Sequence, residues 1–435
     1  MNHDLKSTPA LTRRQATTLI GASAVVASVG LRAAVPSSGS AATKTNEDLY
    51  YSSLREIAGR IKSRDLSPVE LTRLMLERIQ KVDPRLKSFA TVMSDRALVD
   101  AKEAVREIQA GRYRGPLHGM PIAVKDLCYT KGVRTMGGTA VLREFVPTFD
   151  GTVVSRLRVA GAVVLGKLNL SEGAAAGYNP AFDVPLNPWR ADRWPGMSSS
   201  GSGVATAAGL CFAAIGTDTG GSIRMPSSAN GVVGLKPTYG RVSRYGVLAM
   251  APSLDHVGPM ARCVADAAIM FDAIAGRDPR DATSLNEPPS NVLSQLDRGI
   301  KGVRIGVDRS YALTGIDAGQ KAALEKALEV LVNLGARIVD VTMPDLTGLV
   351  DTWMTICSSE MFAAHAANYP SRAHEYGPYL REFLEMGSRV TPTALAAAKK
   401  RRAELTAHFV TLLDSVDAMA GPAGGDPAWP ITHEL

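Results

Sequence analysis

Cysteine is scarce in this chain of 435 residues, and metal-ligand spacings are missing. Cys128, Cys211, Cys263 and Cys357 stand singly in apolar surroundings, which favours buried thiols over a disulfide framework. Neither H-E-x-x-H nor C-x-x-C occurs, so the usual zinc patterns are excluded. The sequence therefore offers no evident metal site.

The common motifs of nucleophiles and nucleotide loops are also absent. No S-x-x-K occurs, and the G-x-S-x-G elbow does not surround Ser222. For the Gly/Ser-rich stretch 196–206 to be a dinucleotide-binding loop, it would need a third glycine. To be a phosphate-binding loop, it would need to end in Gly-Lys-Ser/Thr. Both are missing, so nucleotide binding is not expected.

Positive charge is in modest excess, with a formal net charge of +7. No basic patch interleaved with aromatic residues accompanies it, so a nucleic-acid partner is not expected. The basic cluster KKRR at 399–402 fits the polar face of a helix. Residues 1–42 hold four basic residues and one acidic residue, so their removal would leave a charge of +4.

What the sequence does contain is a segment, 196–239, that is dense in glycine and serine and almost free of charge. Gly220 and Gly221 lack a Cβ, so the chain before Ser222 can take positive φ and point successive N–H groups into one concavity. Such amides stabilise the negative charge that develops on an attacked carbonyl. Because His118 and His256 lie in other segments and belong to no nucleophile motif, a lysine becomes the candidate base.

These motifs resemble the amidase signature family. GTDTGGSIRMP at 216–226 and GLKPT at 234–238 follow the family pattern without a gap, and GMPIAVKD at 119–126 is similar to its lysine motif. The resemblance covers about residues 50–285. Further matches are GKLN at 166–169, NP at 187–188 and SLDHVGP at 253–259.

The resemblance implies that Ser222 is the nucleophile, Ser198 a bridging serine with a cis peptide bond, and Lys125 the base. Burial disfavours a charged amine and lowers its pKa, so a neutral Lys125 would take the Ser222 proton through Ser198 and return it to the departing amine. The backbone N–H groups expected to stabilise the oxyanion are those of Thr219, Gly220, Gly221 and Ser222.

Some positions near this site depart from the family pattern or allow two interpretations. Met197 and Ser200 stand where the family usually has glycine, and their side chains would narrow the approach to Ser198. Arg224 either clamps an acidic substrate or holds the loop through Asp218. The sequence leaves this choice open.

Apolar periodicity predicts alternating helices and strands. Ser67 to Glu70 forms a capping box with proline at the first helical position, opening a helix to about Val82. Residues 88–93, 162–165 and 303–307 are typical of strands. The predicted class is a layered α/β fold, which the resemblance sharpens to the amidase signature fold, with a mixed central sheet flanked by helices.

The predicted domains are a signal peptide at 1–42 and an amidase domain at 43–435, with a signature core at about 119–260. The TRRQ motif at 12–15 precedes a charge-free run at 16–31 and resembles a twin-arginine export signal. That run is too short and too rich in Ala, Ser and Gly for a membrane span. We expect export by the twin-arginine machinery, with a periplasmic or secreted product.

The end of the chain, beyond residue 417, is rich in glycine and proline. The resemblance implies a further strand region there that completes the sheet, so the C-terminal part is expected to be short relative to the family. Missing strands would leave backbone groups unpaired, which keeps an inactive homologue open as an alternative.

The predicted function is hydrolysis of a linear carboxamide through a Ser222 acyl-enzyme, with a small-molecule amide as substrate and no metal or cofactor. A second alternative is the A subunit of a glutamine-dependent tRNA amidotransferase. That alternative predicts a cytosolic chain, whereas the export signal predicts a periplasmic or secreted one and so argues against it. A homodimer is left open.

Overall fold

The computed structural model describes residues 46–288, 291–424, 428 and 430–431. The predicted export signal at 1–42 lies outside this range. Within the described residues, no helix combines the length and the apolar character that a membrane span requires.

A six-stranded mixed sheet forms the core, in the order β1-β3-β2-β4-β6-β5. β2 pairs in parallel with β3 and β4, whereas the pairs β1–β3, β4–β6 and β6–β5 are antiparallel. β2, β3 and β4 are buried along their whole length, as expected for apolar runs covered on both faces. The predicted mixed sheet is thus confirmed. The strands are β1 (Phe89–Val92), β2 (Pro121–Lys125), β3 (Val163–Leu168), β4 (Ala213–Asp218), β5 (Val233–Gly234) and β6 (His256–Ala261).

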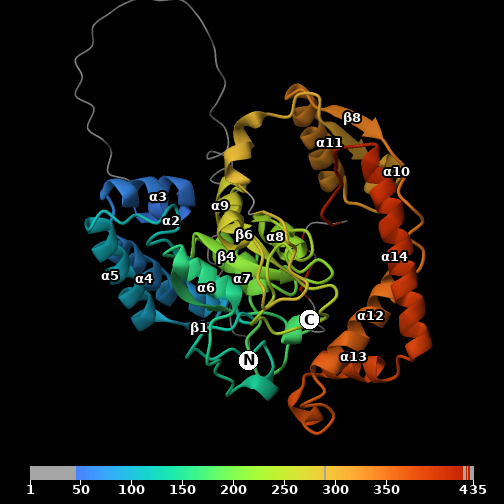
Figure 1. Ribbon diagram of the computed structural model, residues 1–435, viewed down its shortest axis with the longest axis horizontal. Helices are drawn as coiled ribbons and strands as arrows, with labels where there is room; N and C mark the ends of the chain where they lie inside the picture. Colours follow the sequence, from blue (N-terminus) through green and yellow to red (C-terminus); the bar gives the residue numbers. More distant parts are fainter. Residues whose placement is uncertain (1–45, 289–290, 425–427, 429, 432–435) are drawn as a thin grey trace, which may run out of the picture.

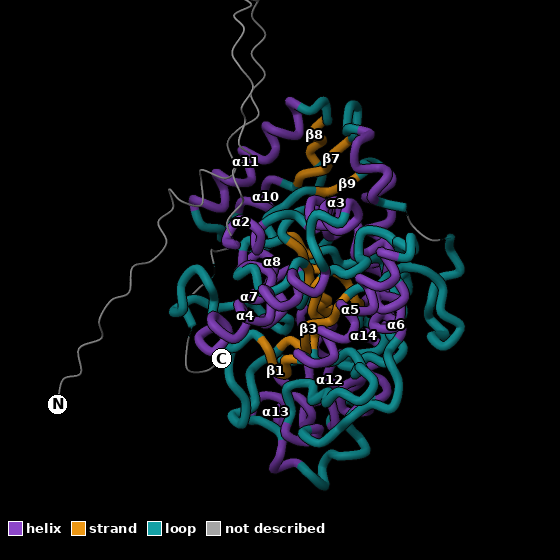
Figure 2. The backbone as a smooth tube through the Cα atoms, turned by 90° about the vertical axis from the view of Figure 1, so that its left-hand side faces the viewer, coloured by secondary structure: helices purple, strands orange, loops and turns teal. Residues whose placement is uncertain are grey.

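Helices flank this sheet on both sides in Figure 2, where its orange strands, among them β1 and β3, run through the middle of the molecule. α4 packs on α5, α5 packs on β3, α7 contacts β2 and β4, and α9 packs on β6. Cys128, Cys211 and Cys357 are buried and free, as predicted, whereas the free Cys263 is half-buried. The helices of this part are α2 (Asn46–Tyr51), α3 (Leu54–Ser63), α4 (Pro68–Leu86), α5 (Ser94–Gln109), α6 (Thr152–Val159), α7 (Ser200–Ala207), α8 (Arg224–Asn230) and α9 (Val264–Ile274).

The helix predicted after Ser67 is α4. The Ser67 side chain caps it by accepting a hydrogen bond from the Val69 N–H, and Pro68 is its first residue. The helix continues past Val82 to Leu86, with Pro84 inside it. The predicted start is therefore confirmed, and the predicted end is one turn too early.

The second half of the chain forms a smaller parallel sheet and a group of helices at the right of Figure 1. The sheet has the order β8-β7-β9. α12 packs on both α13 and α14. These elements are β7 (Arg304–Val307), β8 (Arg337–Asp340), β9 (Ala418–Met419), α10 (Arg309–Leu313), α11 (Ala318–Asn333), α12 (Leu349–Ala364), α13 (Pro378–Ser388) and α14 (Pro392–Asp414).

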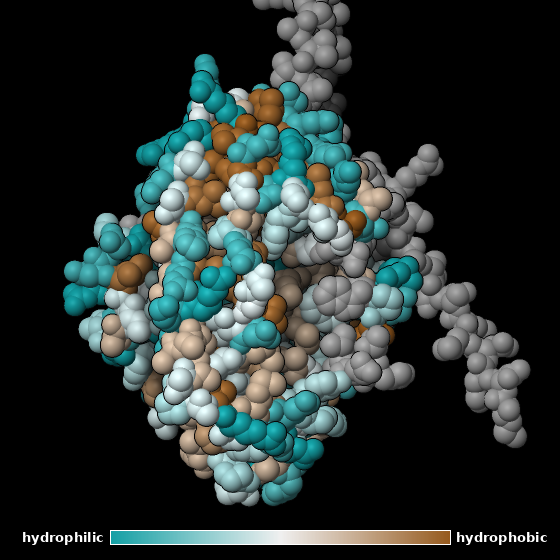
Figure 3. All heavy atoms as spheres, turned by 90° about the vertical axis from the view of Figure 1, so that its right-hand side faces the viewer, coloured by the Kyte–Doolittle hydropathy of each residue, from teal (hydrophilic) through white to brown (hydrophobic). Residues whose placement is uncertain are grey.

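Apolar side chains in this second half of the chain are more exposed to solvent than those around the six-stranded sheet. Figure 3 shows apolar side chains gathered high on this face, at the height where Figure 1 places β8, α11 and the upper end of α14. The exposed large apolar side chains of α11 and α14 are those of Val330, Val332, Val410 and Leu413. The deep core therefore belongs to the six-stranded sheet, where the candidate site also lies.

A buried ion pair joins β3 to the end of β2. Lys167 Nζ lies 3.0 Å from Asp126 Oδ1, and both side chains are fully buried. Lys167 also donates a hydrogen bond to Thr135 Oγ1 at 2.6 Å, and Asp126 Oδ2 accepts one from the Met136 N–H. The pair thus fixes the chain directly after Lys125.

We expect Lys167→Met to lower the free energy of unfolding by about 3–5 kcal/mol, because it leaves Asp126 buried without its charge partner. Urea unfolding followed by circular dichroism measures this loss. The double variant Lys167→Met/Asp126→Asn should recover part of the stability. An unchanged urea midpoint for Lys167→Met would contradict a structural role of the pair.

Candidate active site

Lys125 is the last residue of β2, the strand-end position that the apolar run before it predicts, and it is fully buried. Its Nζ donates hydrogen bonds to Ser198 Oγ at 2.6 Å and to Thr217 Oγ1 at 2.8 Å. Burial lowers the pKa of Lys125 from 10.5 to about 7. Both partners are hydroxyls, and within the part of the chain that the structure describes no carboxylate forms an ion pair with this amine.

Ser198 and Ser199 lie on the short approach to α7. The peptide bond between Met197 and Ser198 is cis. The Ser199 N–H donates to the carbonyl oxygen of Ser222 at 3.3 Å, and Ser199 Oγ accepts from the Thr217 N–H at 3.2 Å. The structure therefore brings Lys125 and Ser198 into direct contact, and the backbone of the next serine connects them to Ser222.

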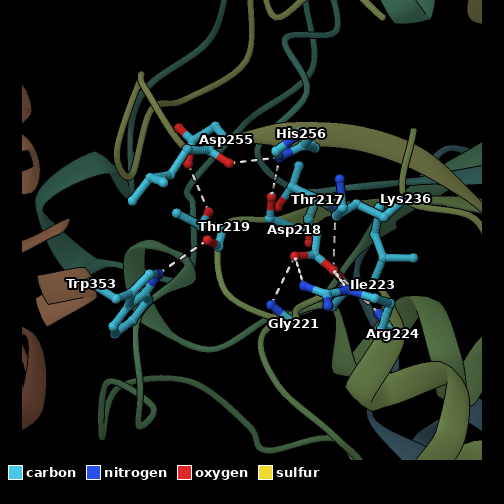
Figure 4. A network of polar contacts seen from close by, with 12 residues as sticks. Thr217, Asp218, Thr219, Gly221, Ile223, Arg224, Lys236, Asp255, His256 and Trp353 are labelled. Atoms are coloured by element: carbon cyan, nitrogen blue, oxygen red, sulfur yellow. Dashed lines mark hydrogen bonds and ion pairs between the residues drawn. The ribbon is translucent and has the colours of Figure 1, made fainter. Parts of the chain in front are cut away.

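The turn between β4 and α8 carries the predicted oxyanion donors, residues 219–222. Asp218 lies beneath it and accepts hydrogen bonds from the N–H groups of Gly221 (2.8 Å) and Ile223 (3.2 Å). The Gly221 N–H, which the sequence assigns to an oxyanion, is thus directed at this carboxylate. Figure 4 shows the turn folded around Asp218.

Arg224 holds this turn. Its Nε and Nη2 donate to the two oxygens of Asp218, each at 2.9 Å. Burial alone would raise the pKa of Asp218, but the hydrogen bonds and charge of Arg224 outweigh it, so the pKa is lowered. Of the two interpretations that the sequence left open, the structure favours the contact with Asp218.

The two glycines of the turn serve different purposes. Gly221 has a φ of +130°, in the region that side chains rarely adopt, as predicted. Gly220 does not have a positive φ, so this part of the prediction is wrong. A Cβ on Gly220 would instead lie 2.8 Å from ring atoms of Trp353, so the position needs glycine for close approach.

The positions that depart from the family pattern are accommodated locally. Ser200 is the first residue of α7, and its Oγ accepts a hydrogen bond from the Tyr178 hydroxyl at 2.8 Å. Burial raises the pKa of this tyrosine, so the hydroxyl stays protonated as a donor. Met197 is half-buried.

The histidines have partners of their own. His118 Nε2 lies 3.1 Å from Glu107 Oε2. His256 Nδ1 lies 2.6 Å from the carbonyl oxygen of Leu254 and 3.2 Å from that of Asp218. Across the described residues, no group of three or more His, Cys, Asp or Glu side chains has a geometry that could hold a metal ion.

Three side chains at the site were not identified from the sequence, namely Thr217, Asp255 and Trp353. Thr217 lies on β4, beside β2, and its hydroxyl contacts the Lys125 amine. Asp255 accepts a hydrogen bond from Thr219 Oγ1 at 2.7 Å, and Trp353 Nε1 donates to Thr219 O at 3.1 Å. The adjacency of β2 and β4 that brings Thr217 to Lys125 is a feature of the fold that the sequence does not show, and nothing in the sequence points to Trp353.

A cavity of about 240 Å³ opens beside the turn and is lined in part by Thr217, Thr219 and Asp255. A second cavity, of about 230 Å³, lies between α12 and α13, with Trp353, Met354, Tyr379 and Phe383 in its walls. Both cavities include Met250 in their walls. The turn therefore borders space in which a small molecule fits.

Comparison with known proteins gives the class to which this site belongs. The family model named Amidase matches residues 70–435. The chain is also 45% identical over 372 residues to the putative amidase AmiD of Mycobacterium tuberculosis, covering 86% of this chain and 78% of that protein. The chain belongs to this family of amide-hydrolysing enzymes.

Two further relatives bear on the particular activity. The chain is 41% identical over 414 residues to the A subunit of the glutamyl-tRNA(Gln) amidotransferase of Geobacter sulfurreducens, covering 89% of this chain and 85% of that one. The native peptide amidase of Stenotrophomonas maltophilia has a TM-score of 0.80 at 34% identity, covering 88% of this chain and 86% of that chain. The mixed sheet with flanking helices is thus that of solved amidases.

Proposed function

We propose that the protein hydrolyses linear carboxamides through an acyl-enzyme on Ser222. The observation that carries this proposal is the 2.6 Å contact between Lys125 Nζ and Ser198 Oγ, made by a buried amine whose pKa is about 7. Such an amine is largely neutral at pH values above 7 and can accept a proton, which an exposed lysine cannot do.

In this mechanism Lys125 takes the proton of Ser198 while Ser198 takes that of Ser222. The Ser222 oxygen bonds to the carbonyl carbon, and backbone N–H groups of the turn stabilise the oxyanion. The C–N bond then breaks as the proton returns through Ser198 to the leaving nitrogen. Water, activated by the same relay, cleaves the ester and releases the acid.

The test of this proposal is acyl transfer to hydroxylamine. The purified enzyme is supplied with primary amides, an anilide and a C-terminally amidated peptide, and ammonia or amine, acid and hydroxamate are quantified. An acyl-enzyme predicts the same ratio of hydroxamate to acid for amides that share an acyl group but differ in leaving group. Ratios that change with the leaving group would contradict a common intermediate.

The amidotransferase alternative is favoured by the 41% identity to the A subunit of such an enzyme. It predicts that L-glutamine is the preferred member of the substrate panel. Ammonia release from glutamine, with no turnover of the other amides, would support this alternative over the general amidase.

We also propose export by the twin-arginine route, supported by TRRQ at 12–15 before the uncharged run 16–31. Fractionation of cells that express the full chain tests it, with the periplasm or medium as the expected location. The variant Arg13→Lys/Arg14→Lys should accumulate in the cytoplasm. Equal distribution of the two forms would contradict twin-arginine export.

A further inference from the structure

The first residue of the turn, Thr219, is held through its backbone by a helix from the second half of the chain. Trp353 of α12 donates its indole N–H to the Thr219 carbonyl oxygen at 3.1 Å. Its ring also lies against Gly220, at 2.8 Å from the position that a Cβ would occupy. Figure 4 shows the indole pointing at the turn from the side opposite Arg224.

This carbonyl contact fixes the direction of one N–H group. The peptide between Thr219 and Gly220 is planar and trans, so its C=O and N–H point in opposite directions. With the carbonyl oxygen held by Trp353, the Gly220 N–H must face away from α12. Gly220 itself is exposed.

The amide of Gly220 matters because that of its neighbour is committed elsewhere. The Gly221 N–H donates to Asp218 at 2.8 Å and is not directed at a ligand. Among the described residues, the Gly220 N–H has no hydrogen-bond acceptor, and its direction is set by the contact between Trp353 and the Thr219 carbonyl oxygen of the same peptide.

The side chain of Thr219 is held by the same part of the chain, through one intermediate loop. Its hydroxyl donates to Asp255 Oδ1 at 2.7 Å. In the loop before Asp255, the Ser253 N–H donates to Glu360 Oε2 at 2.8 Å, and Arg402 Nη2 donates to the Ser253 carbonyl oxygen at 2.8 Å. Glu360 lies on α12 and Arg402 on α14, and these two helices pack on each other.

We propose that Trp353 is a positioning residue for the oxyanion site, and that α12 and α14 together hold Thr219 so that the Gly220 N–H faces the reacting carbonyl. This inference rests on the proposed function, since it assigns the Gly220 N–H to the oxyanion of that reaction. Trp353 acts through the Thr219 peptide and not by touching the reacting atoms.

The experiment compares Trp353→Phe, which removes the indole N–H and keeps an aromatic ring, with Trp189→Phe as a matched control. Trp189 Nε1 donates to the carbonyl oxygen of Asn230 at the end of α8, and its side chain is exposed. Trp353→Phe should lower kcat about 10- to 100-fold with KM nearly unchanged, because an oriented oxyanion donor acts mainly in the transition state. Trp189→Phe should leave both constants unchanged.

Two further measurements keep the inference testable. Thr219→Val removes the bond to Asp255 with little change in shape and should show the same loss in kcat. Hydrogen exchange of the backbone amides in peptides that span 213–222, followed by mass spectrometry, should be faster in Trp353→Phe than in the wild type and in Trp189→Phe.

The outcomes separate the proposed amide hydrolysis from the positioning role of Trp353. If the wild type turns over no amide, the proposed function fails, and the exchange of peptides 213–222 still decides whether Trp353 orders the turn. If the wild type is active but Trp353→Phe matches it in kcat and in exchange, the positioning role is wrong. A 10- to 100-fold rise in the KM of Trp353→Phe with an unchanged kcat would also overturn the positioning role, since that result indicates that Trp353 only contacts the substrate.

Discussion

Replacing Ser222 by alanine is expected to lower amide hydrolysis by about 10⁴-fold or more, because the variant cannot form the acyl-enzyme. Ser222 is half-buried and its carbonyl oxygen accepts the Ser199 N–H, a contact that alanine keeps. The fold and the melting temperature should therefore change little. Steady-state kinetics on the best amide of the panel measure the loss.

The control for this variant is Ser228→Ala, which removes an exposed hydroxyl six residues further along the chain, on α8. It should keep the wild-type rate. Reaction with a fluorophosphonate adds a direct readout, with a single adduct on Ser222 by peptide mapping in the wild type and in Ser228→Ala. An adduct on another serine, or full activity of Ser222→Ala, would show that the nucleophile is misassigned.

The elements of the core could be predicted because their signals are local. The cap at Ser67 and the apolar run before Lys125 lie within a few residues of what they determine, so α4 and β2 begin where the pattern indicates. The extension of α4 to Leu86 was not visible, since Pro84 suggests an earlier end. Helix ends depend on packing that the local sequence does not encode.

The chemistry of the site depends on partners that are distant in sequence. Lys125 and Lys167 both lie at the ends of buried strands of the same sheet, and both side chains are fully buried. Lys167 lies against the carboxylate of Asp126, whereas the Lys125 amine donates hydrogen bonds to the hydroxyls of Ser198 and Thr217. Composition and periodicity do not separate these two lysines, and only the resemblance pointed to Lys125.

The contacts from α12 and α14 are the part that the sequence could not reveal. Trp353 lies 134 positions from Thr219, and Arg402 lies 149 positions from Ser253. KKRR at 399–402 is typical of a solvent-facing run, which describes Lys400 with its partner Glu404 but not Arg402. The inward turn of Arg402 toward Ser253 is therefore not marked by any periodicity of the sequence.

The pH dependence of turnover should report the titration of Lys125. The active form of this base is neutral, so kcat/KM should be level above pH 7 and fall about tenfold per pH unit below the pKa of about 7. Lys125→Ala should lower kcat/KM by about 10²–10⁴-fold and remove this limb. A wild-type limb that persists in the variant would assign the titration to another group.

The same pKa makes a prediction for stability, with a definite sign. In the unfolded chain Lys125 takes up a proton below its ordinary pKa of 10.5, while in the folded protein it does so only below about 7. The unfolded state therefore binds more protons between these values, and the wild type loses stability as the pH falls from 10.5 to 7, by about 4 kcal/mol in total.

The variant Lys125→Met should not show this loss of stability, because methionine binds no proton. Its stability relative to the wild type, measured by urea unfolding, should be greater at pH 7 than at pH 9.5 by about 3 kcal/mol. Lys321→Met, at an exposed position of α11, should show no such difference. If the stability of Lys125→Met relative to the wild type were the same at pH 7 and at pH 9.5, the buried amine of the wild type would keep its charge. A charged amine is incompatible with the role of Lys125 as the base.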